Sequence, residues 1–196
     1  MIRSPNRSVA LRVAIAMSCA AAMTACSDDP ATGNAAENRA TSETLAAALA
    51  GTDGFSTASR ALVETGLAPV FDGPGTYTLL APDDDAFGAL GAAGEALMAE
   101  DQRAVLVALL RNHIVPGQID AESVRDAIEA RGGTVRMRTL GGGSLSFALD
   151  GERLVVSREG QRAEIDTARE VIASNGAFLP IDAVLVRPPA PVSSPG

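Results

Sequence analysis

Residues 75–87 read GTYTLLAPDDDAF, and this stretch predicts a strand, a turn and the start of a helix. Thr76–Ala81 combines β-branched, aromatic and aliphatic residues, which favours a strand. Pro82 ends that run because it has no N–H to donate to a ladder. Asp83 then occupies a helix N-cap position, and the next two aspartates fall in the first turn, where the helix dipole favours negative charge. We prefer capping to a calcium site because the spaced carboxylates of an EF-hand loop are absent.

Helical patterns lie on both sides of this stretch. Upstream, apolar residues at helical spacing predict two helices, the second of which begins near Asp53 and ends at Gly66. Downstream, Asp101–Asn112 predicts a helix that leads into a short strand, His113–Val115. A further helix is predicted over Ala121–Ala130.

The last third of the chain is rich in strand patterns, separated by turns at residues 141–143 and 150–151. The predicted strands are Thr134–Leu140, Ser144–Leu149, Arg153–Ser157, Ala163–Ile172 and Ala177–Arg187. Pro180 cannot donate to a ladder, so we expect it at an edge, a bulge or an unpaired position. Helices first and strands later indicate an α+β fold.

Four segments in this order resemble the signatures of the fasciclin (FAS1) domain family. They are residues 75–87, residues 109–117 (LLRNHIVPG), residues 139–145 (TLGGGSL) and residues 173–185, which begin ASNG and end IDAVL. The resemblance implies a single domain with a β-sandwich-like core and helices packed around its edge, which agrees with the α+β pattern. It also implies a secreted or membrane-tethered extracellular module used in adhesion and matrix interaction.

The first 25 residues predict an export signal. Residues 1–12 contain three arginines and no acidic residue, and an uncharged run, VAIAMSCAAAM, follows at positions 13–23. This order is typical of a secretory signal peptide. The run is too short to span a bilayer, which takes roughly 20 apolar residues. Residues 23–26 (MTAC) resemble the bacterial lipobox, so we expect Cys26 to carry a lipid anchor. The alternative is ordinary cleavage that leaves Cys26 as a free thiol.

These signals divide the chain into four parts. We expect a lipoprotein signal peptide at 1–25, a flexible tether at 26–41, the FAS1 domain at 42–187 and a disordered Pro-rich tail at 188–196. Cys19 lies in the signal peptide, so the mature chain keeps one cysteine and cannot form an internal disulfide. Its stability must then come from packing.

Charge and missing residue types exclude several functions. The chain has 16 basic and 24 acidic residues and a net charge of −8; loss of three arginines with the signal makes it −11. This argues against nucleic-acid binding. Lysine is absent and His113 is the only histidine, which excludes a Schiff base, a Walker A motif and a two-histidine zinc site. We expect no enzymatic activity, no metal and no cofactor; a hydrolase with a carboxylate pair is the remaining catalytic alternative.

Four residues are candidates for interaction through the family resemblance. In animal members, a Tyr-His pair and an Asp-Ile pair near the C-terminus are tied to integrin contact. The matching residues are Asn112-His113 and Glu170-Val171. Because both pairs differ from the family's, integrin binding is not carried over. The structural alternative for His113 is a partly buried ring that bonds to neighbouring backbone.

Other conspicuous residues have structural explanations. Phe71 and Phe87 are expected to be core anchors. Asn175-Gly176 is expected to supply positive φ for a turn, with the asparagine side chain bonded to nearby backbone.

The function expected from the sequence is an interaction module at the cell envelope. Its anchor would be the lipid on Cys26, and its partner an extracellular or envelope protein or a polysaccharide. With Ser27 after the cysteine, the resemblance to bacterial lipoproteins implies the outer membrane, with a periplasmic or secreted location as the alternative. The alternative function is a carrier of a small apolar ligand, because the apolar residues are mostly aliphatic and only 3% of the chain is aromatic.

Overall fold

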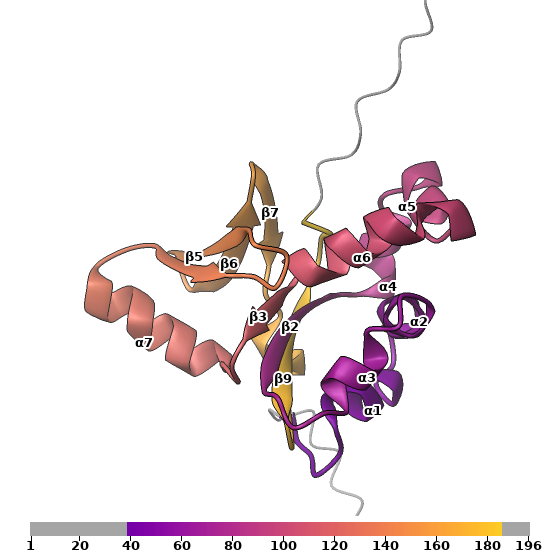
Figure 1. Ribbon diagram of the computed structural model, residues 1–196. Helices are drawn as coiled ribbons and strands as arrows, with labels where there is room; N and C mark the ends of the chain where they lie inside the picture. Colours follow the sequence, from indigo (N-terminus) through magenta and orange to yellow (C-terminus); the bar gives the residue numbers. More distant parts are fainter. Residues whose placement is uncertain (1–38, 186–196) are drawn as a thin grey trace, which may run out of the picture. The chain divides into compact units, whose positions relative to one another are not determined.

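The structure, a computed structural model, describes residues 39–185 (Figure 1). The α-helices are α1 (Leu45–Ala50), α2 (Ser56–Glu64), α3 (Ala68–Phe71), α4 (Asp84–Gly88), α5 (Ala92–Leu97), α6 (Arg103–Asn112) and α7 (Ala121–Arg131). Two short 3-10 helices are η1 (Glu100–Gln102) and η2 (Thr167–Arg169). The strands are β1 (Arg39–Ala40), β2 (Tyr77–Pro82), β3 (Ile114–Pro116), β4 (Val135–Arg138), β5 (Ser144–Asp150), β6 (Arg153–Arg158), β7 (Gln161–Glu164), β8 (Val171–Ala173) and β9 (Gly176–Ile181). The α+β prediction is confirmed.

The larger sheet has five strands in the order β1-β8-β9-β2-β3. At its centre β2 and β9 run parallel, with Tyr77 opposite Gly176. Side chains alternate between the two faces of a strand, so Leu79 belongs to one hydrophobic core and Leu80 to another. Burial on both faces explains why β2 is apolar without alternation, as strands of parallel pairs often are.

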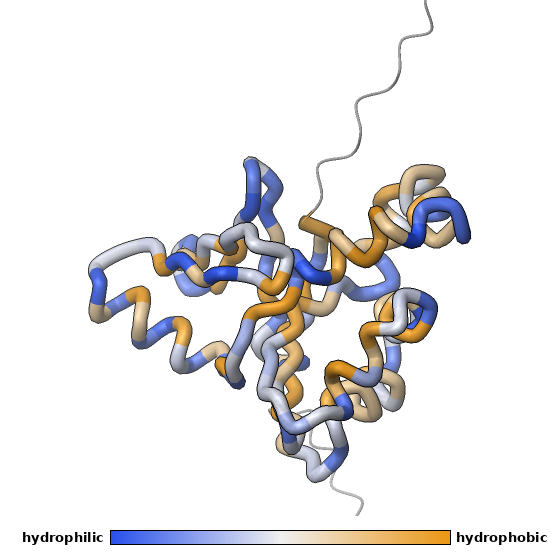
Figure 2. The backbone as a smooth tube through the Cα atoms, in the orientation of Figure 1, coloured by the Kyte–Doolittle hydropathy of each residue, from blue (hydrophilic) through white to orange (hydrophobic). Residues whose placement is uncertain are grey.

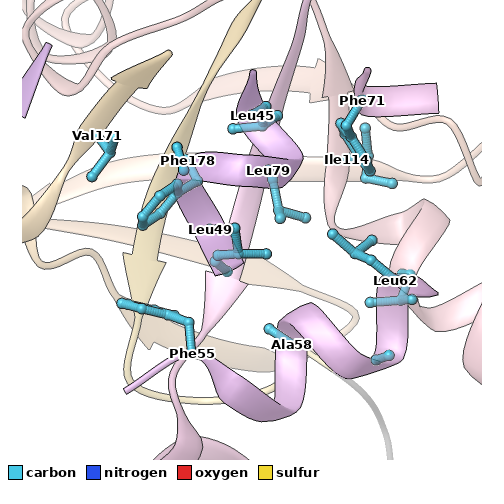
Figure 3. Close-up of a cluster of buried hydrophobic side chains, with 14 of the residues drawn as sticks. Leu45, Leu49, Phe55, Ala58, Leu62, Phe71, Leu79, Ile114, Val171 and Phe178 are labelled. Carbon is cyan, nitrogen blue, oxygen red and sulfur yellow. The ribbon is translucent and has the colours of Figure 1, made fainter. Parts of the chain in front are cut away.

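The first core lies between one face of this sheet and the helices α1 to α6 (Figures 1 and 3). Figure 3 shows side chains of α1 and α2 gathered against Leu79 and Phe178 of the sheet. Phe55 meets Phe178 edge to face, with ring centroids 5.3 Å apart, a favourable aromatic arrangement. Phe71 and Phe87 are also buried in this core, which confirms their prediction as core anchors.

The second core lies on the opposite face of the five-stranded sheet. It is closed by α7 and by an antiparallel sheet of four strands in the order β4-β5-β6-β7. Phe147 and Val156 pair across β5 and β6 and are buried together with Val124 and Ile128 of α7. Orange and blue segments alternate along α7 in Figure 2, as expected for a helix with one buried face.

Element ends follow the signals read from the sequence. Gly66 follows α2 with a φ of 72°, and Gly132 ends α7 with a φ of 66°. This backbone conformation favours glycine. Asp83 caps α4, where its Oδ1 accepts a hydrogen bond from the Ala86 N–H at 2.8 Å. The capping prediction is therefore confirmed.

The predicted strand Ala163–Ile172 is wrong. The chain leaves β7 after Glu164, forms η2, and starts β8 at Val171 in the other sheet. Asp166 opens the intervening turn, where its Oδ1 accepts from the Ala168 N–H at 3.0 Å. The turn contains neither glycine nor proline, so its sequence carries no strong breaker signal.

The expectation of positive φ at Asn175-Gly176 is also wrong, since neither residue adopts it. Gly176 is required for a different reason: a Cβ there would overlap the carbonyl oxygen of Tyr77 on β2. The Asn175 side chain does bond to backbone, but far along the chain. Its Oδ1 accepts from the Leu45 N–H at 2.8 Å and its Nδ2 donates to the Phe71 carbonyl at 2.5 Å. Asn175 thus ties the turn before β9 to α1 and α3.

Pro180 lies in the central strand β9. The expectation of an unpaired position is met on the side of β9 that faces β8. The β8 ladder ends at Phe178, two residues earlier, so Pro180 is unpaired on that side. Its carbonyl accepts from the Asp166 N–H at 2.9 Å. On the other side it stands opposite Ala81 of β2.

Several predictions fall outside the described residues: the signal peptide 1–25, Cys26, most of the 26–41 tether and the 188–196 tail. The last tether residues that are described, 39–40, form β1, and Ala40 stands opposite Ile172 of β8. Of the helices in residues 39–185, none has the length and apolar composition that crossing a membrane requires.

Candidate functional site

Asn112 and His113 lie where α6 ends and the chain turns into β3. His113 is the C-cap of α6, and its backbone N–H donates to the Leu110 carbonyl at 2.8 Å. The chain is already extended at Ile114. This abrupt change leaves the His113 ring inside the fold, and its side chain is fully buried.

Both ring nitrogens of His113 are occupied by backbone. Nδ1 lies 2.9 Å from the Leu109 carbonyl oxygen, and Nε2 lies 3.0 Å from the Leu185 N–H nitrogen. A carbonyl only accepts and an N–H only donates, so the neutral ring with its proton on Nδ1 satisfies both. Burial lowers the pKa of His113 to about 4, the Arg158 charge acts in the same direction, and the bond to Leu109 opposes both. His113 therefore pins the end of the described chain to α6 as a neutral ring.

Asn112 is half-buried and faces the turn between β4 and β5. Its Nδ2 donates to the Ala108 carbonyl at 2.8 Å, and its Oδ1 accepts from the Thr139 hydroxyl at 3.2 Å. A Cβ at Gly141 would collide with this side chain, which gives the glycine turn a steric reason. Asn112 therefore joins α6 to the four-stranded sheet.

Glu170 is a buried carboxylate at the start of β8, with 3% of its surface exposed. Its Oε1 accepts from the Ala121 N–H at 2.9 Å, at the first turn of α7. Burial raises the pKa of Glu170, the hydrogen bond from Ala121 opposes this, and the neighbouring Asp120 and Glu122 add to the rise. Glu170 thus fastens α7 to the five-stranded sheet.

Val171 is 4% exposed and belongs to the first core, opposite Phe178. The two candidate pairs are not brought together, because β3 and β8 are separated in the sheet by β2 and β9. Three of the four candidate side chains are buried and all four hold elements together. His113 matches its structural alternative, with deeper burial than expected and one partner, Leu185, distant in sequence.

Two further side chains with structural roles were missed. Asp84 accepts from the N–H groups of Ser56 and Thr57 at 3.2 and 2.8 Å, and from the Ser56 hydroxyl at 2.9 Å. It therefore caps α2 from the first turn of α4. Burial acts to raise the pKa of Asp84, but these hydrogen bonds outweigh it and lower the pKa below its ordinary value. The run of three consecutive aspartates was the only sequence feature that could have pointed to this second cap.

Arg169 of η2 is the second missed residue. Its guanidinium carbon lies 4.7 Å from the Phe55 ring centroid, and its Nη2 donates to the Asp53 carbonyl at 3.1 Å. Nη1 lies 3.8 Å from an Asp83 carboxylate oxygen. These contacts connect η2 to the residues just before α2 and to the N-cap residue of α4. No local sequence pattern predicts them.

Three clefts of the described surface have volumes of about 280 to 380 Å³, and charged residues make up half or more of the lining of each. A cleft of about 280 Å³ at α5 and α6 is lined by Glu64, Met98, Ala99, Glu100, Arg103 and Leu106. Half of these residues carry a charge, so the cleft does not favour an apolar ligand, whose sites are predominantly apolar. Within residues 39–185, no three His, Cys, Asp or Glu side chains are grouped so that they could hold a metal ion.

Comparisons with known proteins show which sequences and structures this chain resembles. A sequence model of the fasciclin domain matches residues 53–187. Protein sll1483 from Synechocystis sp. is 32% identical over 146 residues, which is 74% of this chain and 74% of that protein. The pig (Sus scrofa) transforming growth factor-beta-induced protein ig-h3 is 31% identical over 134 residues, 68% of this chain but only 18% of that protein.

A solved structure has the same fold. It is a pair of FAS1 domains from the insect cell adhesion molecule fasciclin I, with a TM-score of 0.64 at 16% sequence identity. The match covers 74% of this chain and 51% of that chain.

Proposed function

Because the chain belongs to the fasciclin domain family, we propose that it is an adhesion module held at the bacterial cell envelope by a lipid on Cys26. The observation that carries the proposal is the fasciclin domain match over residues 53–187, in a chain whose residues 1–25 have the pattern of a signal peptide and are followed by Cys26. The named relatives include a cell adhesion molecule, fasciclin I. Adhesion is the activity that this combination supports best.

The buried candidates support a binding role that uses the outer surface of the domain. His113, Glu170 and Val171 are engaged in holding α6, α7 and the five-stranded sheet. A partner that reaches them would have to unfold part of the core. We therefore place the adhesive surface on exposed side chains, and assign these three residues to the stability of the domain.

A lipid on Cys26 would present the domain beyond the membrane surface. Twelve residues, 27–38, separate the cysteine from β1. A single acyl chain gives only marginal membrane binding, so stable anchoring takes more than one chain or an additional signal. Radiolabelled palmitate should enter the wild-type chain and fail to enter Cys26→Ser. Equal labelling of both chains would refute the anchor.

The adhesive half of the proposal is tested in the source organism. A strain that lacks the gene should attach to surfaces and to other cells less than its parent, and the gene supplied in trans should restore attachment. Unchanged attachment and aggregation in the deletion strain would refute adhesion as the function.

A further inference from the structure

The outer face of the four-stranded sheet is built differently from its inner face. The cross-strand row that faces the second core is buried and apolar: Val135, Phe147, Val156 and Ala163. The adjacent row points to the opposite face because side chains alternate along each strand. Its members are Arg136, Ser146, Ser157 and Arg162, and none of them is buried.

The outer face carries arginines on both of its edge strands. Arg136 and Arg138 are two residues apart on β4, so they share this face at a spacing of roughly 6.6 Å. Ser144 stands opposite Arg138 and is exposed. Neither Arg136 nor Arg138 forms an ion pair with another described residue. On β7, Arg162 is instead paired with Asp150.

Two guanidinium groups without an ion-pair partner in the described residues lie side by side on one face of a chain whose net charge is −8. One structural explanation is that charged side chains on an edge strand, such as β4, prevent pairing with another sheet. Protection of an edge strand can be provided by charges of either sign. It does not involve the serines of the inner strands β5 and β6. The serine hydroxyls beside Arg136 add polar groups that edge protection does not use, one of which, on Ser157, donates to the Ser146 carbonyl at 3.4 Å.

We propose that this serine–arginine face, formed by Arg136, Arg138, Ser144, Ser146 and Ser157, binds a polysaccharide that carries carboxylate groups. The inference rests on the proposed adhesive function and names its partner. An arginine can bind a carboxylate through two parallel hydrogen bonds. Serine hydroxyls both donate and accept, as sugar hydroxyls do. The row from Arg136 to Ser157 crosses three strands and spans roughly 10 Å, a length over which an extended sugar chain can lie.

The same face is poorly suited to a membrane or to a protein partner. The large hydrophobic side chains exposed in residues 39–185 are Val63, Val70 and Val105, which lie on α2, α3 and α6 and not on this sheet. Protein interfaces depend on buried aromatic or arginine anchors in pockets, and membrane-surface segments insert apolar side chains. The β4 side of this face offers hydroxyl and guanidinium groups and no large apolar side chain to insert. A cleft of about 300 Å³ at its β7 edge is lined mainly by charged residues, among them Asp150, Arg162 and Glu164.

The test uses the purified mature lipoprotein in detergent and polygalacturonate immobilised on a sensor surface. The control ligand is the same polymer with its carboxylates reduced to alcohols. The protein should bind polygalacturonate about tenfold or more tightly than the reduced polymer, and added salt should weaken this binding. Equal binding to both polymers, or equal or tighter binding to phosphatidylglycerol vesicles, would overturn the proposal.

Two pairs of variants separate this role from edge protection and from net charge. Arg136→Glu/Arg138→Glu keeps charges on the edge strand but reverses their sign, and it should lower the affinity about tenfold or more. Arg60→Glu/Arg103→Glu changes the net charge equally on α2 and α6, and should stay within about twofold of wild type. Arg136→Gln/Arg138→Gln serves if charge reversal disturbs folding, as circular dichroism would show. An equal loss in the control pair would refute the assignment.

The outcome is independent of the adhesion test. If wild-type protein binds the polymer while the deletion strain attaches normally, the face binds polysaccharide and the adhesive function is refuted. If the deletion strain loses attachment while the purified protein ignores polygalacturonate, the proposal about this face fails alone.

Discussion

His113 has no exposed surface and both of its ring nitrogens already have backbone partners. Protonation would place a second N–H against the Leu185 N–H and bury a charge at the same time. The ring is therefore a buried polar group that is satisfied only when neutral. Acidification should weaken the contact between α6 and the end of the described chain.

We predict that His113 makes the stability of the domain depend on pH between about 6.5 and 4. Its pKa is about 4 when folded and 6.5 ordinarily, so the unfolded chain takes up the proton first as the pH falls. The contribution is complete above pH 6.5, and roughly 3 kcal/mol is lost by pH 4. Urea unfolding across this range should show a shallower pH dependence in His113→Gln than in wild type. Identical slopes for the two proteins would contradict the assignment.

Glu170 gives a pH dependence of opposite sign. Its pKa is raised by burial, so its contribution is greatest when the carboxyl is protonated and is lost as the pH rises through the folded value. Glu170→Gln keeps an oxygen for the Ala121 N–H and removes the buried charge, so it should be at least as stable as wild type at pH 7. Glu170→Ala leaves that N–H unsatisfied and should be about 1–3 kcal/mol less stable than the glutamine variant. A glutamine variant as unstable as the alanine variant would contradict this role.

The roles of single residues could be predicted only where they are local. The Asp83 cap uses a partner three residues away, and the pattern revealed it. The partners of His113, Glu170 and Asn175 include groups 72, 49 and 130 residues distant. No rule based on sequence spacing applies over such distances. The residue types therefore marked these positions as unusual, but their hydrogen-bond partners could not be predicted.

Among the elements, α2 and α4 are coupled through one carboxylate. Asp84 lies in the first turn of α4, where the dipole of that helix favours a negative charge. Its carboxylate also accepts hydrogen bonds from the first two backbone N–H groups of α2. One side chain thus satisfies donors that Phe55, the N-cap residue of α2, leaves unpaired. The carboxylate therefore holds the N-terminus of α2 against the first turn of α4.

We predict that Asp84→Ala lowers the free energy of unfolding by about 1–2 kcal/mol, as loss of a helix cap does. Asp85→Ala is the matched control, since Asp85 is exposed in the same first turn and should cost no more than about 0.5 kcal/mol. Chemical unfolding of the three proteins at pH 7 measures both values. Equal destabilisation by the two substitutions would show that Asp84 acts only through the α4 dipole.

Elements with strong periodicity or clear end signals were predictable, and short ones were not. α6, α7 and the strands β4, β5 and β6 agree with the predicted ranges within a few residues, whereas β7 does not. α3 and α5 have four and six residues, too few to show a helical period. The move from β7 to β8 changes sheets through a turn whose residues suit a strand as well, so only tertiary packing decides it.

At the level of the whole molecule, the described part is a five-stranded sheet buried on both faces, with a second sheet exposed on its outer side. The buried family positions serve stability, which leaves outward-facing side chains for binding. Fold class and family were predictable because four motifs occur in order. The position of the outer arginines was not, since it depends on the register between β4 and β5.

Attachment of cells that express Cys26→Ser tests the central claim most directly. The deletion strain would carry either the wild-type gene or the variant, with export of equal amounts verified by immunoblot, and the fraction of cells retained on a surface under defined flow would be counted. We predict that the wild-type gene restores retention and that the variant, exported but unanchored, leaves it at the level of the deletion strain. Full restoration by Cys26→Ser would contradict an adhesion module that acts from a lipid anchor.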